Sequence, residues 1–334
     1  MKRGIILTFL LCAPLAAEDG HALRRTIQLQ ELPQHESPVI TALALQPRGN
    51  LLASAGDDHI VRLWDIESGL LQQTLTGHRD WVTSLAFCED GSKLITGSRD
   101  RQVLAWSASQ GTRPKQLGIH DYPISSIVVH EPTNLVAIVG FRADLRLYDS
   151  KSHSLLNTLS CPCDDTRAVA FSPSGTLLAA AGRNGKIRIW NLVSDEQVEA
   201  DGHVRRVTSL AFASEETILS AGEDLKIHVW DATNGGKRHS LTHTPGKVLA
   251  ITMLDGNRFA AATSKNEIPL FQLQDAQPYA LLQGHTGSVA ALVARNERLV
   301  SGSFDTTVRV WSIPHHDSKS VFTTRTTARS VTIE

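Results

Sequence analysis

Residues 77–107 read GHRDWVTSLAFCEDGSKLITGSRDRQVLAWS and contain three short apolar runs separated by polar turns. Apolar residues alternate with small or polar ones in VTSLAF, KLITGS and QVLAW, and this period of two is typical of short antiparallel strands. Gly, Asp and Ser fill the segments between the runs, as they do in tight turns. The run LLQQTLT at 70–76 is the fourth run of the preceding unit, so each unit is predicted to contain four strands that follow one another in a meander.

The same unit recurs along the chain. An aromatic residue ends the third run of each unit, and successive copies are 40 to 42 residues apart, at Trp64, Trp106, Tyr148, Trp190, Trp230, Phe271 and Trp311. Because one meander cannot bury both of its faces, the copies must stack around an axis. The sequence therefore predicts an all-β, seven-bladed propeller of four-stranded antiparallel blades. The predicted blade repeats are 38–80, 81–122, 123–165, 166–206, 207–247, 248–288 and 289–317.

The repeats resemble the WD40 β-propeller family over about residues 23–317. The resemblance rests on Gly-His pairs before the first run and Trp-Asp pairs after the third, at Gly77-His78, Gly202-His203, Gly284-His285, Trp64-Asp65 and Trp230-Asp231. It implies that an N-terminal strand, here within 23–32, becomes the outer strand of the last blade. The register of Thr26–Gln30 against Gln73–Thr76 favours this closure over one by the C-terminal segment Val321–Thr327. Either closure removes exposed sheet edges.

Four polar positions recur at fixed offsets, and the resemblance implies that they form a buried hydrogen-bond chain from Trp to Ser or Thr to His to Asp. The four sets are His35/Ser54/Asp58/Trp64, His78/Thr96/Asp100/Trp106, His203/Ser220/Asp224/Trp230 and His285/Ser301/Asp305/Trp311. Ser, His and Asp also make catalytic triads, but an active site is normally built once, so the repetition favours a structural role. The blades of Tyr148, Trp190 and Phe271 depart from the pattern. Pro269 predicts that the Phe271 blade is the least regular.

The composition excludes several classes of protein. The chain has 334 residues, with 33 Lys and Arg against 34 Asp and Glu, so no global positive field favours nucleic acid.

Residues 1–17 combine a basic start, an apolar run and a small-residue end, which predicts a signal peptide cleaved before Glu18. We therefore expect an exported propeller at 18–317, periplasmic or extracellular, and a polar tail at 318–334, with no transmembrane segment in the mature chain. The alternative is a cytoplasmic adaptor that keeps its first residues.

No catalytic, cofactor or metal motif is recognisable in the sequence. The three cysteines outside the leader, Cys88, Cys161 and Cys163, do not have redox or zinc spacing, and we interpret them as buried thiols. The run His315-His316-Asp317 is interpreted as a solvated turn. The sequence thus predicts a non-enzyme without cofactor or metal ion.

The remaining candidate for function is the surface formed by loops at one end of the propeller, which commonly receives partners in the WD40 family. Candidate partner-binding residues there are Trp81, Arg99, Tyr122, Phe141, Arg183, Arg206, Glu223, Lys247 and Phe304. Trp, Tyr and Arg dominate the energetics of protein interfaces. We therefore predict a scaffold, monomeric alone, that binds a protein or peptide. The alternative is a small-ligand or enzymatic site at the mouth of the axial channel.

Overall fold

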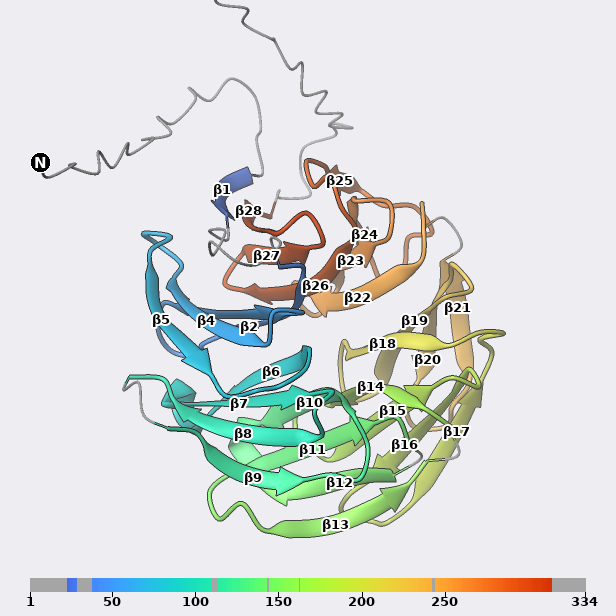
Figure 1. Ribbon diagram of the computed structural model, residues 1–334. Helices are drawn as coiled ribbons and strands as arrows, with labels where there is room; N and C mark the ends of the chain where they lie inside the picture. Colours follow the sequence, from blue (N-terminus) through green and yellow to red (C-terminus); the bar gives the residue numbers. More distant parts are fainter. Residues whose placement is uncertain are drawn as a thin grey trace, which may run out of the picture.

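The computed structural model describes residues 23–28, 38–109, 113–142, 144–161, 163–241 and 244–313. Within these ranges, 28 strands form seven four-stranded antiparallel sheets around a central axis (Figure 1). Two 3-10 turns, Glu89–Gly91 and Glu131–Thr133, each connect the first two strands of a blade. No helix of the described residues is long and apolar enough to cross a membrane. The predicted seven-bladed propeller is confirmed.

Each blade is a meander whose first strand lies nearest the axis (Figure 1). Blades 1 and 2 consist of β2 (Ile40–Leu45), β3 (Leu51–Gly56), β4 (Ile60–Asp65), β5 (Leu71–Thr76) and of β6 (Val82–Cys88), β7 (Lys93–Ser98), β8 (Gln102–Ser107), β9 (Lys115–Ile119). Blades 3 and 4 consist of β10 (Ile124–His130), β11 (Leu135–Gly140), β12 (Asp144–Asp149), β13 (Leu155–Ser160) and of β14 (Thr166–Phe171), β15 (Leu177–Gly182), β16 (Lys186–Asn191), β17 (Gln197–Asp201). Blades 5 and 6 consist of β18 (Val207–Phe212), β19 (Thr217–Gly222), β20 (Ile227–Asp231), β21 (Lys237–Leu241) and of β22 (Val248–Met253), β23 (Arg258–Thr263), β24 (Ile268–Gln272), β25 (Ala280–Leu282).

Blade 7 joins the two ends of the described chain. It consists of β26 (Val289–Arg295), β27 (Arg298–Ser303), β28 (Thr307–Ser312) and the N-terminal β1 (Leu23–Gln28). β1 pairs antiparallel with β28, with Ile27 opposite Val308, and Ile27 is 5% exposed within the core cluster of Val308 and Trp64. The predicted N-terminal closure is confirmed. Residues 29–32 of the predicted closing segment and the competing segment Val321–Thr327 lie outside the described ranges.

The core lies between neighbouring blades. One cluster joins blades 1 and 2 through Ala53, Leu63, Leu85 and Trp106. The second strand of each blade is covered on both faces, so all of its residues after the first are buried. In β15, for example, every residue after Leu177 is buried. Stacking of blade on blade thus buries what a single meander would leave exposed.

Blade 6 is the least regular blade, in agreement with the sequence prediction. β25 has only three residues, and β24 pairs with β23 at three positions. Pro269 in β24 has no N–H to donate. Phe259 and Phe271 stack with ring centroids 5.2 Å apart, which fills the space between β23 and β24 with apolar contacts.

The cysteines differ in part from the expectation of free thiols. Cys161 and Cys163 form a disulfide just before β14, and both side chains are fully buried. Their Cα atoms are 5.1 Å apart, within the range that a disulfide bridges. The sequence spacing alone could not show that both side chains turn to the same side. Cys88 is a buried free thiol, and burial raises its pKa to about 12.

Candidate functional site

One end of the propeller carries the entries to the first strands and the turns between the second and third strands, because strands alternate in direction within a meander. We name this end the top face. Backbone bonds join the two kinds of loop there: Arg99 N donates to Trp81 O and Glu223 N donates to Arg206 O, both at 2.9 Å. The candidate residues Trp81 and Arg99 therefore lie side by side on the top face, and so do Arg206 and Glu223.

Hydrogen-bonded tetrads hold the top-face loops in three blades. In blade 5, Trp230 Nε1 donates to Ser220 Oγ at 2.7 Å, Ser220 Oγ lies 2.6 Å from His203 Nε2, and His203 Nδ1 lies 3.0 Å from Asp224. Since Ser220 accepts from Trp230, its hydroxyl donates to Nε2, and Nδ1–H donates to Asp224. The equivalent contacts in blade 2 join Trp106, Thr96, His78 and Asp100, and in blade 7 Trp311, Ser301, His285 and Asp305.

The surroundings of Asp100 and Asp305 stabilise the ionised forms of these two tetrad aspartates. Burial opposes ionisation of Asp100, but hydrogen bonds from His78 and from the backbone of Arg79 and Gln102 hold its pKa below the usual range. Asp305 has its pKa lowered in the same way by His285 and neighbouring donors. Each aspartate thus fixes the entry to the first strand against the turn between the second and third strands.

Blade 1 has a different arrangement in its described part. Trp64 Nε1 donates to Ser54 Oγ at 2.8 Å, as predicted for a tetrad. Asp58 forms an ion pair with Arg62 at 2.6 Å, and both side chains are more than nine-tenths buried. His35, the predicted histidine of this set, lies outside the described residues.

In blade 2, the top face presents a cation over an aromatic ring. The guanidinium carbon of Arg99 lies 4.2 Å from the ring centroid of Trp81. Among the residues that the structure describes, no carboxylate lies within salt-bridge distance of Arg99, and its buried Nε has no hydrogen-bond partner. This pair is a half-exposed Arg–Trp contact of the kind that is frequent at protein interfaces.

A continuous chain of charges crosses blades 3 to 5. The guanidinium of Arg167 lies 3.7 Å from the ring centroid of Phe141 and forms an ion pair with Asp165 at 2.7 Å. Asp165 also contacts Arg206 at 3.2 Å, and Arg206 contacts Glu223 at 3.5 Å. We name Trp81, Arg99 and these five residues the top-face patch.

Sequence reasoning missed Arg167, although the repeat contains a signal for it. At the equivalent positions, Thr41, Thr83, Ser125 and Thr208 each donate to a backbone carbonyl of the next blade, at 2.6 to 2.8 Å. Arg167 stands where these blades have a hydroxyl, so it cannot make that bridge in the same way. Its side chain instead reaches Phe141 and Asp165 on the top face.

The prediction that Tyr122 contacts a partner is wrong. Tyr122 is only 2% exposed, and burial raises its pKa to about 12. Its ring occupies the space beside Gly140, where an added Cβ would lie 2.3 Å from the Tyr122 ring. The other candidates Arg183, Lys247 and Phe304 are exposed, Phe304 by 44%, but none has a described contact with the patch.

A closed ring of seven four-stranded blades, with loops fixed by repeated tetrads, defines the β-propeller class. The chain belongs to the WD40 family, described as "WD domain, G-beta repeat", which matches residues 26–65, 69–107, 153–191, 196–231 and 276–312. Each matched segment contains one aromatic-terminated third strand. The unmatched segments include Tyr148 and Phe271, which end the third strand in two of the departing blades. WD40 propellers are typically non-catalytic scaffolds for protein interactions.

Curated relatives match most of this chain. "Pre-mRNA-processing factor 19 homolog 2" of Arabidopsis thaliana is 26% identical over 90% of the chain and 59% of that protein. "Periodic tryptophan protein 2" of Saccharomyces cerevisiae is 23% identical over 82% of the chain and 38% of that protein. "WD repeat-containing protein 91 homolog" of Dictyostelium discoideum is 25% identical over 85% of the chain and 40% of that protein. The chain thus spans less than two thirds of each of these relatives.

Proposed function

We propose that this chain binds a protein or peptide partner through the top-face patch over blades 2 to 5, without catalysing a reaction. The observation that carries the proposal is the continuous contact from Phe141 through Arg167, Asp165 and Arg206 to Glu223, which spans three blades. A partner segment laid across the channel mouth would contact several blades at once. Membership of a family of interaction scaffolds supports this role.

The charges of the patch favour a partner with carboxylates. The patch has three guanidinium groups, on Arg99, Arg167 and Arg206, and two carboxylates, on Asp165 and Glu223. Arg99 has no ion-pair partner among the described residues, so its charge is available to an incoming group. Planar guanidinium groups bind carboxylates in a forked, bidentate geometry. An acidic partner segment with an aromatic or aliphatic anchor near Trp81 would match this surface.

The direct test locates the contact. The partner is purified with the full chain after mild cross-linking, and the cross-linked peptides are mapped by mass spectrometry. We expect cross-links to concentrate on the top face, at Lys226 and Lys247, which are exposed there. Cross-links confined to Lys151, an exposed residue at the opposite end, would contradict the proposed surface.

A second candidate function is supported by a cavity in the axial channel. A cavity of about 410 Å³ lies between the ends of β10, β14 and β18, opposite the top face. Its volume falls in the range of small-molecule sites. Its lining is mostly apolar and includes no carboxylate, and His130 already bonds to Thr133 and Pro173 through its two nitrogens. A ligand-induced rise in Tm across a metabolite library would favour this function, and an unchanged Tm would exclude it.

We also propose that residues 1–17 direct export. These residues lie outside the described ranges, and the proposal rests on their sequence pattern together with the Cys161–Cys163 disulfide. Disulfides persist mainly in oxidising compartments. The test combines N-terminal sequencing of the native protein with alkylation of its thiols. Export predicts a terminus at Glu18 and one reactive thiol after unfolding, whereas an intact Met1 with three reactive thiols outside the leader would contradict it.

A further inference from the structure

Blade 5 has a histidine at a position where no other blade has one. His228 lies in β20, two residues before the tetrad tryptophan Trp230. The equivalent residues of the other blades are Arg62, Leu104, Arg146, Arg188, Pro269 and Arg309. His228 is 1% exposed, so at this position of the third strand blade 5 alone buries an imidazole ring.

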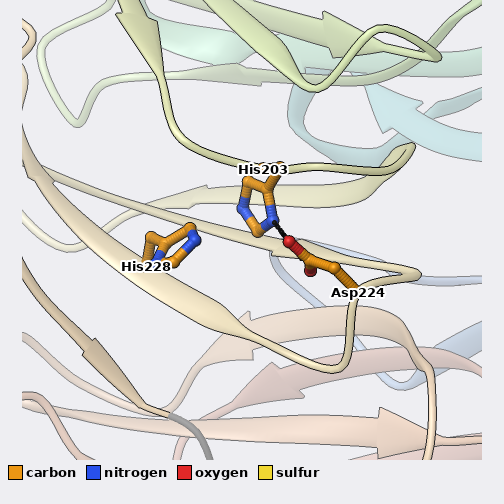
Figure 2. Close-up of side chains that lie close together, drawn as sticks. All are labelled: His203, Asp224 and His228. Carbon is orange, nitrogen blue, oxygen red and sulfur yellow. Dashed lines mark hydrogen bonds and ion pairs between the residues drawn. The ribbon is translucent and has the colours of Figure 1, made fainter.

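His228 faces the His203–Asp224 pair of the tetrad (Figure 2). Its ring centroid lies 4.3 Å from that of His203. One ring nitrogen of each histidine and one oxygen of Asp224 all lie within 4.8 Å of one another. His228 Nδ1 bonds to Ser240 Oγ at 2.7 Å, whereas the buried Nε2 has no hydrogen-bond partner among the described residues.

We propose that His203, Asp224 and His228 form a binding site for a divalent transition-metal ion, and for Zn²⁺ in particular. Two imidazole nitrogens and one carboxylate oxygen are ligands that Zn²⁺ accepts, with a fourth position left for water. Ligands at zinc distances lie roughly 3.3–3.6 Å apart in a tetrahedron. The three donor atoms are therefore close enough to converge on one ion after small side-chain movements.

Neighbouring hydroxyl groups hold the two imidazole rings in place. An ion bound to His203 Nδ1 beside Asp224 would replace the proton there, and this proton would move to Nε2, from which it would be donated to Ser220 Oγ. Ser220 on His203 Nε2 and Ser240 on His228 Nδ1 would keep the two rings oriented.

An unmet bonding requirement supports the site. Buried polar atoms are nearly always paired, and a coordinated cation would satisfy His228 Nε2. The tetrads of blades 2 and 7 lack this third donor because Leu104 and Arg309 replace the histidine.

The test titrates metal-free full-length protein with ZnCl₂ by isothermal calorimetry. His315 and His316 are changed to Ala in every sample, because this pair could bind zinc on its own. We expect one ion per chain, and a loss of affinity of at least about tenfold in His228→Leu. Leucine is the matched choice because Leu104 fills this position in blade 2. Equal affinity in His228→Leu, or no zinc binding by the parent protein, would overturn the proposal.

A second measurement decides the question if His228→Leu does not fold. Zinc added to the parent protein should shift the imidazole ¹⁵N resonances of His203 and His228 and leave those of His78 unchanged. Resonances of His203 and His228 that do not move at saturating zinc would overturn the site.

The converse test introduces the equivalent residues of blade 5 into blade 2. Leu104 faces Gln116 across β8 and β9 as His228 faces Ser240 across β20 and β21. Leu104→His with Gln116→Ser should therefore build a second site beside His78 and Asp100. We expect two zinc ions per folded chain and a doubled tetrahedral Co²⁺ absorption. A folded double variant that still binds one ion would contradict the proposed geometry.

Discussion

His120 shows what the loss of one tetrad partner does to a single residue. In blade 3, Ile138 stands where the blades with a tetrad have Ser or Thr, so His120 Nε2 is buried without a hydrogen-bond partner among the described residues. Arg146 approaches Nδ1 at 3.3 Å, where it can only donate. Burial, and then the charge of Arg146, lower the pKa of His120 to about 4, although Asp121 opposes the shift.

Because the pKa of His120 is lower in the folded chain, His120 should make the free energy of unfolding depend on pH. Between pH 6.5 and about 4 the unfolded chain binds a proton at His120 that the folded chain does not, so the free energy of unfolding falls as the pH falls. The full effect is roughly 3 kcal/mol, since one pKa unit corresponds to about 1.4 kcal/mol. Urea unfolding of wild type and His120→Leu across this range should show a shallower pH slope in the variant. Identical slopes would contradict the assignment.

The tetrad serine of blade 5 should be important for stability. Ser220→Ala removes the acceptor of Trp230 Nε1 and the donor to His203 Nε2, and leaves both buried nitrogens unpaired. We expect a loss of about 2–4 kcal/mol in the free energy of unfolding, because each unpaired buried group costs about 1–3 kcal/mol. Ser194→Ala, on an exposed turn, is the control and should change stability by less than about 0.5 kcal/mol. Equal effects of the two variants would argue against a structural tetrad.

At the scale of the element, β14 differs from β2, β6, β10 and β18 in the side chain that follows its first residue. Thr41, Thr83 and Thr208 bridge to the next blade, but Arg167 at the equivalent position points to Phe141 and Asp165. In β14 the hydroxyl that would donate a hydrogen bond to the next blade is therefore absent, and a charged side chain lies at the channel mouth in its place. A residue that weakens the packing of the fold in this way is expected at a functional site, where binding requires its side chain.

Arg167→Thr tests this interpretation. The new hydroxyl can donate to the backbone carbonyl of Val207, as Thr41 donates to that of Val82. We expect an unchanged or higher Tm together with weaker partner binding. A lower Tm with unchanged binding would show that Arg167 serves the fold alone.

Sequence reasoning predicted the strands, their order and the ring, because the Trp positions and the period of about 41 residues depend on local pattern and repetition. It did not predict features set by contacts between distant residues. Tyr122 is buried because Gly140, in another strand, leaves space for its ring. Cys161 and Cys163 pair because the backbone before β14 turns both side chains inward. Arg167 was missed because its role depends on Phe141, which comes from the neighbouring blade.

At the scale of the whole molecule, closure makes the top face a single rigid surface. β1 pairs with β28 and supplies the outer strand of blade 7. All seven blades therefore have four strands, and the ring of stacked blades is complete. The loops that carry Trp81, Phe141 and Arg206 are therefore fixed relative to one another by stacked sheets. A rigid surface loses little conformational entropy when it binds, which favours a scaffold role.

The affinity of the purified partner for two matched double variants tests the central claim most directly. Trp81→Ala with Arg99→Ala removes the cation–aromatic pair of the top face. Arg48→Ala with Val193→Ala changes exposed residues at the opposite end. We predict that the first pair weakens binding at least about tenfold at unchanged Tm and that the second pair has no effect. Full affinity in the first pair, or an equal loss in both, would contradict the proposal that the top face binds the partner.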